Sequence, residues 1–222
     1  MSARVRSVNV GQPKQREWAG LGVTSIDKRP VAGAVRAHRL GLEGDTVSDT
    51  KHHGGVDQAV YAFAREDLDV WGERLRKPIA DGQFGENLTT EGIDVNEAVV
   101  GTRWRIGTAL FEVAYVRTPC NDFKNWMGES GFDNARWVKR FATECRPGPY
   151  LRVIEEGELT AGDEIVAESV PDHGITVATM FRAINLDRSL LPQLLQIDDL
   201  VENVRDAATR VAEGLPPRRG SV

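Results

Sequence analysis

The sequence predicts a mainly β fold of the barrel or sandwich class. Between residues 1 and 170, short apolar or alternating segments recur, and most of them end at glycine, aspartate or proline. The chain of 222 residues carries 22 glycines and 10 prolines, which supply many turns. Only two segments of this region have the three- and four-residue apolar spacing of a helix.

Seven strands are expected in order along this region. Residues 5–10 alternate apolar and polar side chains before a glycine and proline turn, and residues 24–28 precede Pro30. The other strands are likewise bounded by turn residues, and they are expected at residues 58–63, 103–106, 110–116, 151–154 and 164–167.

Two helices should interrupt the strands. Residues 65–75 place Leu68, Trp71 and Leu75 on one face, and residues 134–141 form a second short helix. The repeated return to short strands predicts one β domain over residues 1–170 with a few inserted helices.

The pattern changes after residue 170. Apolar residues then follow helical spacing at residues 175–184, 188–195 and 198–213, and Asp198 is a suitable cap for the last helix. We therefore expect a helical C-terminal extension of three helices over residues 171–214. Residues 215–222 have no apolar face and are expected to be a disordered tail.

Composition excludes several classes of function. The formal net charge of -5 argues against a nucleic-acid-binding protein, because phosphate backbones require a surplus of lysine and arginine. No apolar run is long enough for a membrane span, and the N-terminus has no secretory segment, so a cytoplasmic protein is expected. No dinucleotide-binding or phosphate-binding loop is complete, which indicates that a redox enzyme of this sequence would take its electrons from outside.

Cys120 is the strongest candidate for a reactive residue. It follows the strand at residues 110–116 and the turn Arg117-Thr118-Pro119, so its thiol lies where the chain leaves the sheet. A nearby guanidinium favours the thiolate, which attacks electrophiles and binds soft metals. A packed, unreactive thiol is the alternative, and for Cys145 at a helix end it is the favoured one.

A second candidate is the loop that contains Lys51, His53, Gly54 and Gly55. The glycines let a ligand approach the backbone, and lysine and imidazole groups are donors for an anion. Adjacent histidines can also bind zinc, although no second ligand cluster is visible. An ordinary turn is the remaining alternative.

Two further segments carry polar side chains in suggestive places. Asn87 lies in a polar loop and has a donor and an acceptor for the edge of a heterocycle, while Glu86 and Thr89 could hold the shape of that loop. Arg152 interrupts an apolar strand and therefore needs a partner, either a carboxylate or a bound anion.

Taken together, these segments resemble the MOSC family, the domain named from the C-terminal part of molybdenum-cofactor sulfurases. The matching pieces follow in family order and are residues 44–45, 52–61, 84–89, 104–107, 117–120 and 150–153. The helical extension resembles that of the YiiM-like branch. Two departures are Thr102 in place of a Gly-Asp turn, and Asn121-Asp122-Phe123 in place of a lysine-leucine pair.

The resemblance implies a MOSC-type β-barrel that binds a molybdenum cofactor (molybdopterin), with Cys120 as metal ligand and catalytic residue. It implies reduction of N-hydroxylated nucleobases, such as hydroxylaminopurines, to amines. Lys51, His53, Arg117 and Arg152 are then candidate donors to the phosphate of the pterin. The expected partners are a small-molecule substrate and an external electron-donor reductase, and a homodimer is left open as an alternative to a monomer.

Two other functions remain open at this point. Cys120 could carry a persulfide as a sulfur carrier for metal-sulfur clusters or for cofactor sulfuration, because persulfide transfer also needs a thiolate. A protein that only binds a small anion through its basic loop would also fit these residues.

Overall fold

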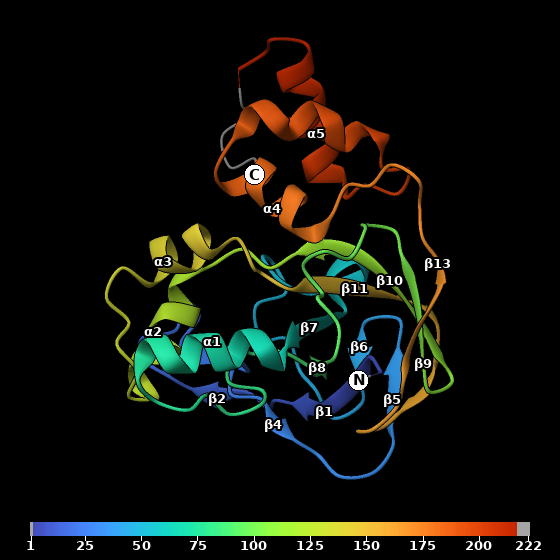
Figure 1. Ribbon diagram of the computed structural model, residues 1–222. Coiled ribbons are helices and arrows are strands. Elements are labelled where there is room, and N and C mark those ends of the chain that lie inside the picture. The colour runs from blue at the N-terminus through green and yellow to red at the C-terminus, as the bar shows by residue number, and fades with distance from the viewer. Residues whose placement is uncertain (1, 217–222) are drawn as a thin grey trace.

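The computed structural model describes residues 2–216, and it is built around one eight-stranded sheet (Figure 1). The order across the sheet is β13-β9-β10-β11-β7-β8-β1-β4. Its strands are β1 (Arg4–Val10), β4 (Arg29–Pro30), β7 (Val60–Ala64), β8 (Leu88–Glu91), β9 (Arg103–Ile106), β10 (Ala109–Val116), β11 (Pro149–Glu155) and β13 (Ile165–Ser169). All eight residues of β10 are buried, as expected for a central strand with both faces covered.

Smaller strands complete the β structure. One further sheet contains β5 (Val35–His38), β6 (Gly41–Leu42) and β12 (Gly157–Leu159), and a hairpin pairs β2 (Lys14–Gln15) with β3 (Val23–Thr24). Six of the seven predicted strands are confirmed, β9 with its predicted bounds and β1, β7, β10, β11 and β13 with small shifts at their ends. The strand predicted at residues 24–28 is wrong, because the chain there turns between the short strands β3 and β4.

The prediction of a closed β-barrel is not confirmed. Within residues 2–216 the sheet has two ends, at β13 and β4, and only one isolated bridge, between Arg4 and Glu164, joins β1 to the segment before β13. Backbone hydrogen bonds from Val5 to Asp163 (2.9 Å) and from Ile165 to Ala3 (2.9 Å) reinforce that contact. On its other side β1 pairs with β8, and that ladder continues across a register shift between Val5 and Ser7.

The pairing of β7 with β8 is parallel, whereas the other ladders found in the sheet are antiparallel. Parallel neighbours need a long crossover, and here it contains α1 (Arg65–Leu75), whose predicted bounds are confirmed. The crossover returns the chain at Asn87, whose backbone N–H donates to the carbonyl of Tyr61 (2.8 Å). The loop predicted around Asn87 is therefore held beside the start of β7.

Aromatic side chains form the core between the sheet and the inserted helices. The rings of Trp71, Phe84, Phe123, Trp137 and Phe141 are all within 7 Å of at least one other ring of the group, and all five are buried. Such burial contributes about 2 kcal/mol or more for each ring. This cluster fixes the helices that follow β7 and β10.

Two of these helices differ from the prediction. The helix predicted at residues 134–141 begins later, as α3 (Trp137–Glu144), because Asp133 accepts a hydrogen bond from the Ala135 N–H (3.0 Å) and Arg136 is left-handed. The sequence did not predict α2 (Asn121–Glu129), which begins directly after Cys120.

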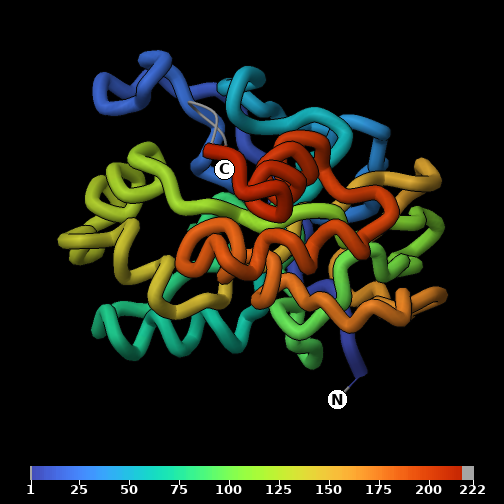
Figure 2. The backbone as a smooth tube through the Cα atoms, turned by 90° about the horizontal axis from the view of Figure 1, so that it is seen from above, coloured from blue at the N-terminus to red at the C-terminus, as the bar shows by residue number. Residues whose placement is uncertain are grey.

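The C-terminal region contains α4 (Val177–Asn185), the 3-10 helix η2 (Arg188–Gln196) and α5 (Glu202–Ala212). Pro192 lies inside η2, and its lack of an N–H suits the tighter and less regular helix. Asp198 does not cap α5, whose N-cap is Val201. Figure 1 and Figure 2 show these helices lying across β10 and β11.

The C-terminal helices share the hydrophobic core of the sheet. Phe181 of α4 contacts Phe141 with 6.4 Å between ring centroids, and the Val100 N–H donates to the carbonyl of Ile175 (2.9 Å). The division at residue 170 stays a prediction. Of the predicted tail, residues 217–222 lie outside the described residues. No helix among residues 2–216 has the length and apolar character that a membrane crossing requires.

Candidate functional site

Cys120 lies where two adjoining cavities meet. The inner cavity has a volume of about 100 Å³, and its wall includes Lys28, Asp45, His53, Asn87, Arg117 and Cys120. The outer cavity has a volume of about 740 Å³, and its wall includes Lys51, His52, Tyr115, Cys120, Tyr150 and Asn203. Asp49, His53, Asp122 and Tyr150 line both of them. The two cavities therefore form one continuous site around the thiol.

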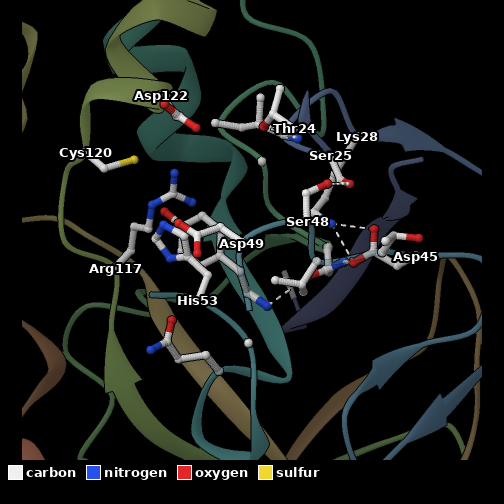
Figure 3. Close-up of a pocket in the computed structure, with 18 of the residues that line it drawn as sticks. Thr24, Ser25, Lys28, Asp45, Ser48, Asp49, His53, Arg117, Cys120 and Asp122 are labelled. Carbon is white, nitrogen blue, oxygen red and sulfur yellow. Dashed lines mark hydrogen bonds and ion pairs between the residues drawn. The ribbon is translucent and has the colours of Figure 1, made fainter. Parts of the chain in front are cut away.

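The local fold aims the Cys120 sulfur into this site. Cys120 is the N-cap of α2, and its Sγ accepts the backbone N–H of Phe123 (3.4 Å). Figure 3 shows the sulfur pointing into the cavity, with the Arg117 guanidinium and the Asp122 carboxylate on either side of it. The first turn of a helix stabilises negative charge, so this position suits a thiolate that binds a metal or attacks an electrophile.

Arg117 is a buried cation without a carboxylate partner among residues 2–216. Its residue is 5% exposed, and its guanidinium lies over the rings of Tyr61 (5.1 Å) and Phe123 (4.8 Å). Its Nη1 donates to the carbonyl of Phe84 at 3.4 Å and the guanidinium also hydrogen-bonds with the Tyr150 side chain, while its Nε has no partner among the described residues. A buried charge normally has an ionic partner, so this geometry leaves room for a bound anion.

The electrostatics of the pocket keep Arg117 charged. Burial acts to lower its pKa, but the interactions with Tyr150, Tyr61 and Cys120 outweigh burial and hold the pKa above its usual value. The same positive charge acts on His53, whose pKa is lowered first by burial and second by Arg117. His53 is therefore a neutral imidazole at pH 7, able to accept or donate a hydrogen bond beside Arg117.

Asp49 holds the histidine loop in shape. Its Oδ1 accepts the backbone N–H groups of Lys51 (3.1 Å) and His52 (3.2 Å), and its Oδ2 lies 2.9 Å from His52 Nδ1. The side chain of Lys51 is exposed at the wall of the outer cavity, whereas His53 reaches both cavities. The loop therefore brings Lys51 and His53 to different parts of the site.

The two glycines of the loop have different roles. Gly54 has φ 78, and a Cβ there would lie 3.2 Å from a methyl group of Val47, so only glycine fits without displacing that wall. Gly55 has φ 77 and open space around it, and it lines neither of the two cavities. Gly55 instead precedes the 3-10 helix η1 (Val56–Gln58).

Sequence reasoning missed Lys28, which is a second buried cation at the inner cavity, beside Arg117. The residue is 8% exposed, and its Nζ contacts both carboxylate oxygens of Asp45. Burial lowers the pKa of Lys28, and the neighbouring Asp45 counteracts part of that effect. No local pattern indicated this pair, because its two members lie on separate segments of the chain.

Asn87 lines the inner cavity, but its amide is already engaged. Its Oδ1 accepts the Tyr61 N–H (3.1 Å), and its Nδ2 donates to Asp45 Oδ2 (2.8 Å) and to the carbonyl of Asn9 (3.3 Å). The expectation that Asn87 binds the edge of a heterocycle is thus not supported by its contacts. It holds β7, β8 and the Lys28–Asp45 pair together.

Glu86 fixes the loop before β8, which was the role predicted for it. Its carboxylate accepts the N–H groups of Gly82 (2.6 Å) and Phe84 (2.9 Å) and the Thr89 hydroxyl (2.9 Å). The side chain is completely buried, and burial outweighs these hydrogen bonds and raises the pKa of Glu86 to about 7.

This raised pKa predicts a pH dependence of stability. The native state binds the proton of Glu86 more tightly than the unfolded chain, so this contribution is complete below the unfolded pKa and is lost as pH rises through about 7. We expect the free energy of unfolding of the wild type to fall relative to Glu86→Gln by roughly 3 kcal/mol between pH 4 and 8. Urea denaturation at several pH values measures it, and parallel curves for the two proteins would refute it.

Arg152 is not brought to this site, which corrects the prediction that it binds the cofactor. Its Nε donates to Asp57 (2.5 Å), its Nη1 to Glu112 (2.9 Å) and its Nη2 to the carbonyl of Asp199 (2.7 Å). It lines a separate cavity of about 220 Å³ near the C-terminal helices. The carboxylate partner that the sequence left open is the one observed.

The protein supplies one soft ligand rather than a complete metal site. Among residues 2–216, no group of three or more histidine, cysteine, aspartate or glutamate side chains could hold a metal ion. Cys145 lies apart, at the C-terminal end of α3, where its Sγ donates to the carbonyl of Ala178 (3.5 Å). A metal at Cys120 would need its other ligands from a bound cofactor.

Comparisons with known proteins agree with this fold. The MOSC domain matches residues 49–166. The uncharacterised protein YflK of Bacillus subtilis is 33% identical over 174 residues, which are 78% of this chain and 76% of YflK. YiiM of Escherichia coli is 35% identical over 100 residues, 44% of this chain and 45% of YiiM.

The crystal structure of YiiM from Geobacillus stearothermophilus superposes with a TM-score of 0.77 at 25% identity. The superposition covers 94% of this chain and 98% of that one. The matched domain contains the histidine loop, Arg117 and Cys120. The chain therefore belongs to the MOSC domain family.

Proposed function

We propose that this protein is a molybdenum-cofactor-dependent reductase of N-hydroxylated compounds, with Cys120 as the ligand of the metal. One observation carries the proposal: a half-buried thiol meets, at the same cavity, a buried guanidinium that has no carboxylate partner within residues 2–216. The residues fit the cofactor in both respects. A thiolate is a suitable ligand for a metal in a soft environment. The phosphate of the pterin is an anion that could pair with the Arg117 guanidinium.

The roles of the residues follow from their places in the site. Cys120 would hold the metal at the junction of the two cavities, and Arg117, His53 and Lys51 would donate hydrogen bonds to the anionic part of the cofactor. The outer cavity has a volume within the usual range for a small ligand, so it would receive the substrate. Arg152 and Gly55, which lie outside the cavities, would support the histidine loop instead.

Reduction of a hydroxylamine breaks the N–O bond and yields an amine and water from two electrons and two protons. When bound, the molybdenum centre supplies the two-electron transfer, and an external reductase would supply the electrons. His53 has a lowered pKa and lines both cavities, so its ring nitrogens can pass a proton from the outer cavity toward Cys120. Hydroxylaminopurine-type base analogues are the substrates we propose.

The test compares protein made in a host that synthesises molybdopterin with protein made in a host that does not. We expect near-stoichiometric molybdenum only in the first preparation, together with turnover of hydroxylaminopurine by a reduced viologen donor. Protein from the competent host that contains no molybdenum and does not turn over hydroxylaminopurine would reject the proposal.

The N-cap position of Cys120 also favours a second function, because the α2 N-terminus would stabilise a persulfide anion. In that case the protein is a sulfur carrier. Mass spectrometry of the intact protein separates the two: one labile added sulfur on Cys120 without molybdenum supports the carrier, and molybdenum without added sulfur supports the reductase.

A further inference from the structure

The outer cavity is not formed by the MOSC domain alone. Asn203, in the first turn of α5, lines it together with Cys120, Tyr115 and Tyr150. The MOSC domain matches only residues 49–166, so Asn203 reaches the cavity from outside the matched region. The C-terminal helices lie across β10 and β11, the strands that carry Tyr115 and Tyr150 (Figure 1; Figure 2).

The turn before α5 is held firmly, so the position of Asn203 is defined. Arg152 donates to the carbonyl of Asp199 (2.7 Å), and Arg205 donates to the carbonyls of Ile197 (2.8 Å) and Asp198 (2.7 Å). Val204, the residue after Asn203, is fully buried. These contacts anchor the start of α5 on both sides of the cavity-lining residue.

The chemistry of this wall suits a flat nitrogen heterocycle. The amide of Asn203 is exposed and presents a donor and an acceptor side by side, which can pair with the edge of a base. Tyr115 and Tyr150 add aromatic surface, with 6.5 Å between their centroids and an angle of 16° between their planes. Asn203 also hydrogen-bonds with the Tyr115 side chain, which fixes the amide relative to that ring.

We propose that Asn203 of α5 is a substrate-recognition residue that pairs with the ring edge of a heterocyclic hydroxylamine and so selects such substrates over aliphatic ones. This inference rests on the proposed function, because it places the substrate in the outer cavity beside Cys120. It assigns the C-terminal helices a part in specificity.

The experiment compares Asn203→Ala and the equal-sized Asn203→Asp with Glu202→Ala, a control at the neighbouring exposed position of α5. We expect KM for hydroxylaminopurine to rise about tenfold in both Asn203 variants, as for the loss of one hydrogen bond, with kcat unchanged. KM for N-ethylhydroxylamine, which has no ring edge, should not change. Molybdenum content should equal that of the wild type in all three variants.

A binding measurement gives a second readout that needs no turnover. Adenine, an amine product of the proposed reaction, is titrated calorimetrically into cofactor-free protein. We expect Asn203→Ala to raise its Kd about tenfold relative to Glu202→Ala.

The outcomes separate this inference from the function on which it rests. If the wild type reduces no hydroxylamine but Asn203→Ala still weakens adenine binding, the proposed function fails and the recognition role stands. If reduction occurs and the two Asn203 variants match the control with both substrates, the recognition role is wrong and the function stands. Loss of molybdenum from a folded Asn203 variant would also overturn the recognition role, because it would mean that Asn203 contacts the cofactor.

Discussion

Cys120→Ser should lose the bound molybdenum and lower the rate of hydroxylamine reduction by roughly a thousandfold or more, while the fold stays intact. Serine places a hard hydroxyl where a soft thiolate would bind the metal. It also caps a helix well, so the N-cap contact with the Phe123 N–H is kept, which alanine would remove. Elemental analysis, turnover and thermal unfolding of the same preparation measure the three effects separately.

Cys145→Ser is the matched control for this experiment. Cys145 is half-buried like Cys120, but it lies at the C-terminal end of α3 and contacts Ala178 rather than either cavity. The control should keep both its metal and its activity. A Cys120→Ser protein that keeps stoichiometric molybdenum would show that Cys120 is not the ligand, and equal losses in the two variants would indicate a general effect of removing a thiol.

Arg117→Met should leave the cofactor-free protein at least as stable as the wild type, while molybdenum retention falls by about ten- to a hundredfold. Arg117 has a long hydrogen bond to the Phe84 carbonyl, a hydrogen bond to the Tyr150 side chain and no carboxylate partner among the described residues, so its burial costs free energy that methionine avoids. The contacts of the guanidinium with the rings of Tyr61 and Phe123 stabilise the folded state by about 1–2 kcal/mol. The sulfur of a methionine can make similar contacts with these rings and would replace part of that stabilisation. Urea denaturation and elemental analysis measure the two effects.

Arg152→Met is the control, and it should lower the stability of the protein, which Arg117→Met should not. Removal of Arg152 takes the shared cation from Asp57 and from the buried Glu112, which keeps only Arg103 (3.1 Å), so we expect a loss of roughly 1.5–3 kcal/mol in the free energy of unfolding. The two arginines differ in whether the protein itself supplies the anion. If Arg117→Met destabilises the cofactor-free protein as much as Arg152→Met does, Arg117 serves the fold and not a ligand.

The parts of the fold that were predictable are those encoded by local patterns. The apolar spacing of Leu68, Trp71 and Leu75 defined both ends of α1, because no competing contact disturbs that helix. The spacing of Phe123, Trp126 and Met127 is equally helical and indicates α2, although this helix was not among those predicted. Had α2 been recognised, the N-cap role of Cys120 would have followed.

The site was predictable only where its residues belong to one segment. Arg117 and Cys120 are three residues apart and do meet, and His53 joins them through the histidine loop. Lys28 and Arg152 could not be assigned, because the identity of a buried partner depends on which distant strand lies beside it. Arg152, a predicted anion-binding residue, forms an ion pair with Glu112 on the paired strand β10. Lys28, which was not predicted, forms an ion pair with Asp45 at the wall of the inner cavity.

The scattered origin of the cavity wall determines when during folding the site forms. The residues that line the inner cavity come from segments between Val23 and Tyr150. They include Tyr61 of β7 and Asn87 just before β8, which is the parallel neighbour of β7. Contacts between segments that are distant in the sequence have the largest entropic cost of loop closure. A chain that depends on them folds more slowly than one held by local contacts. The histidine loop and α1 can form early from local contacts, whereas Tyr150 reaches the cavity wall when β11 pairs with β10 and β7. We therefore expect the cavity around Cys120 to form late in folding, after these distant strands have paired.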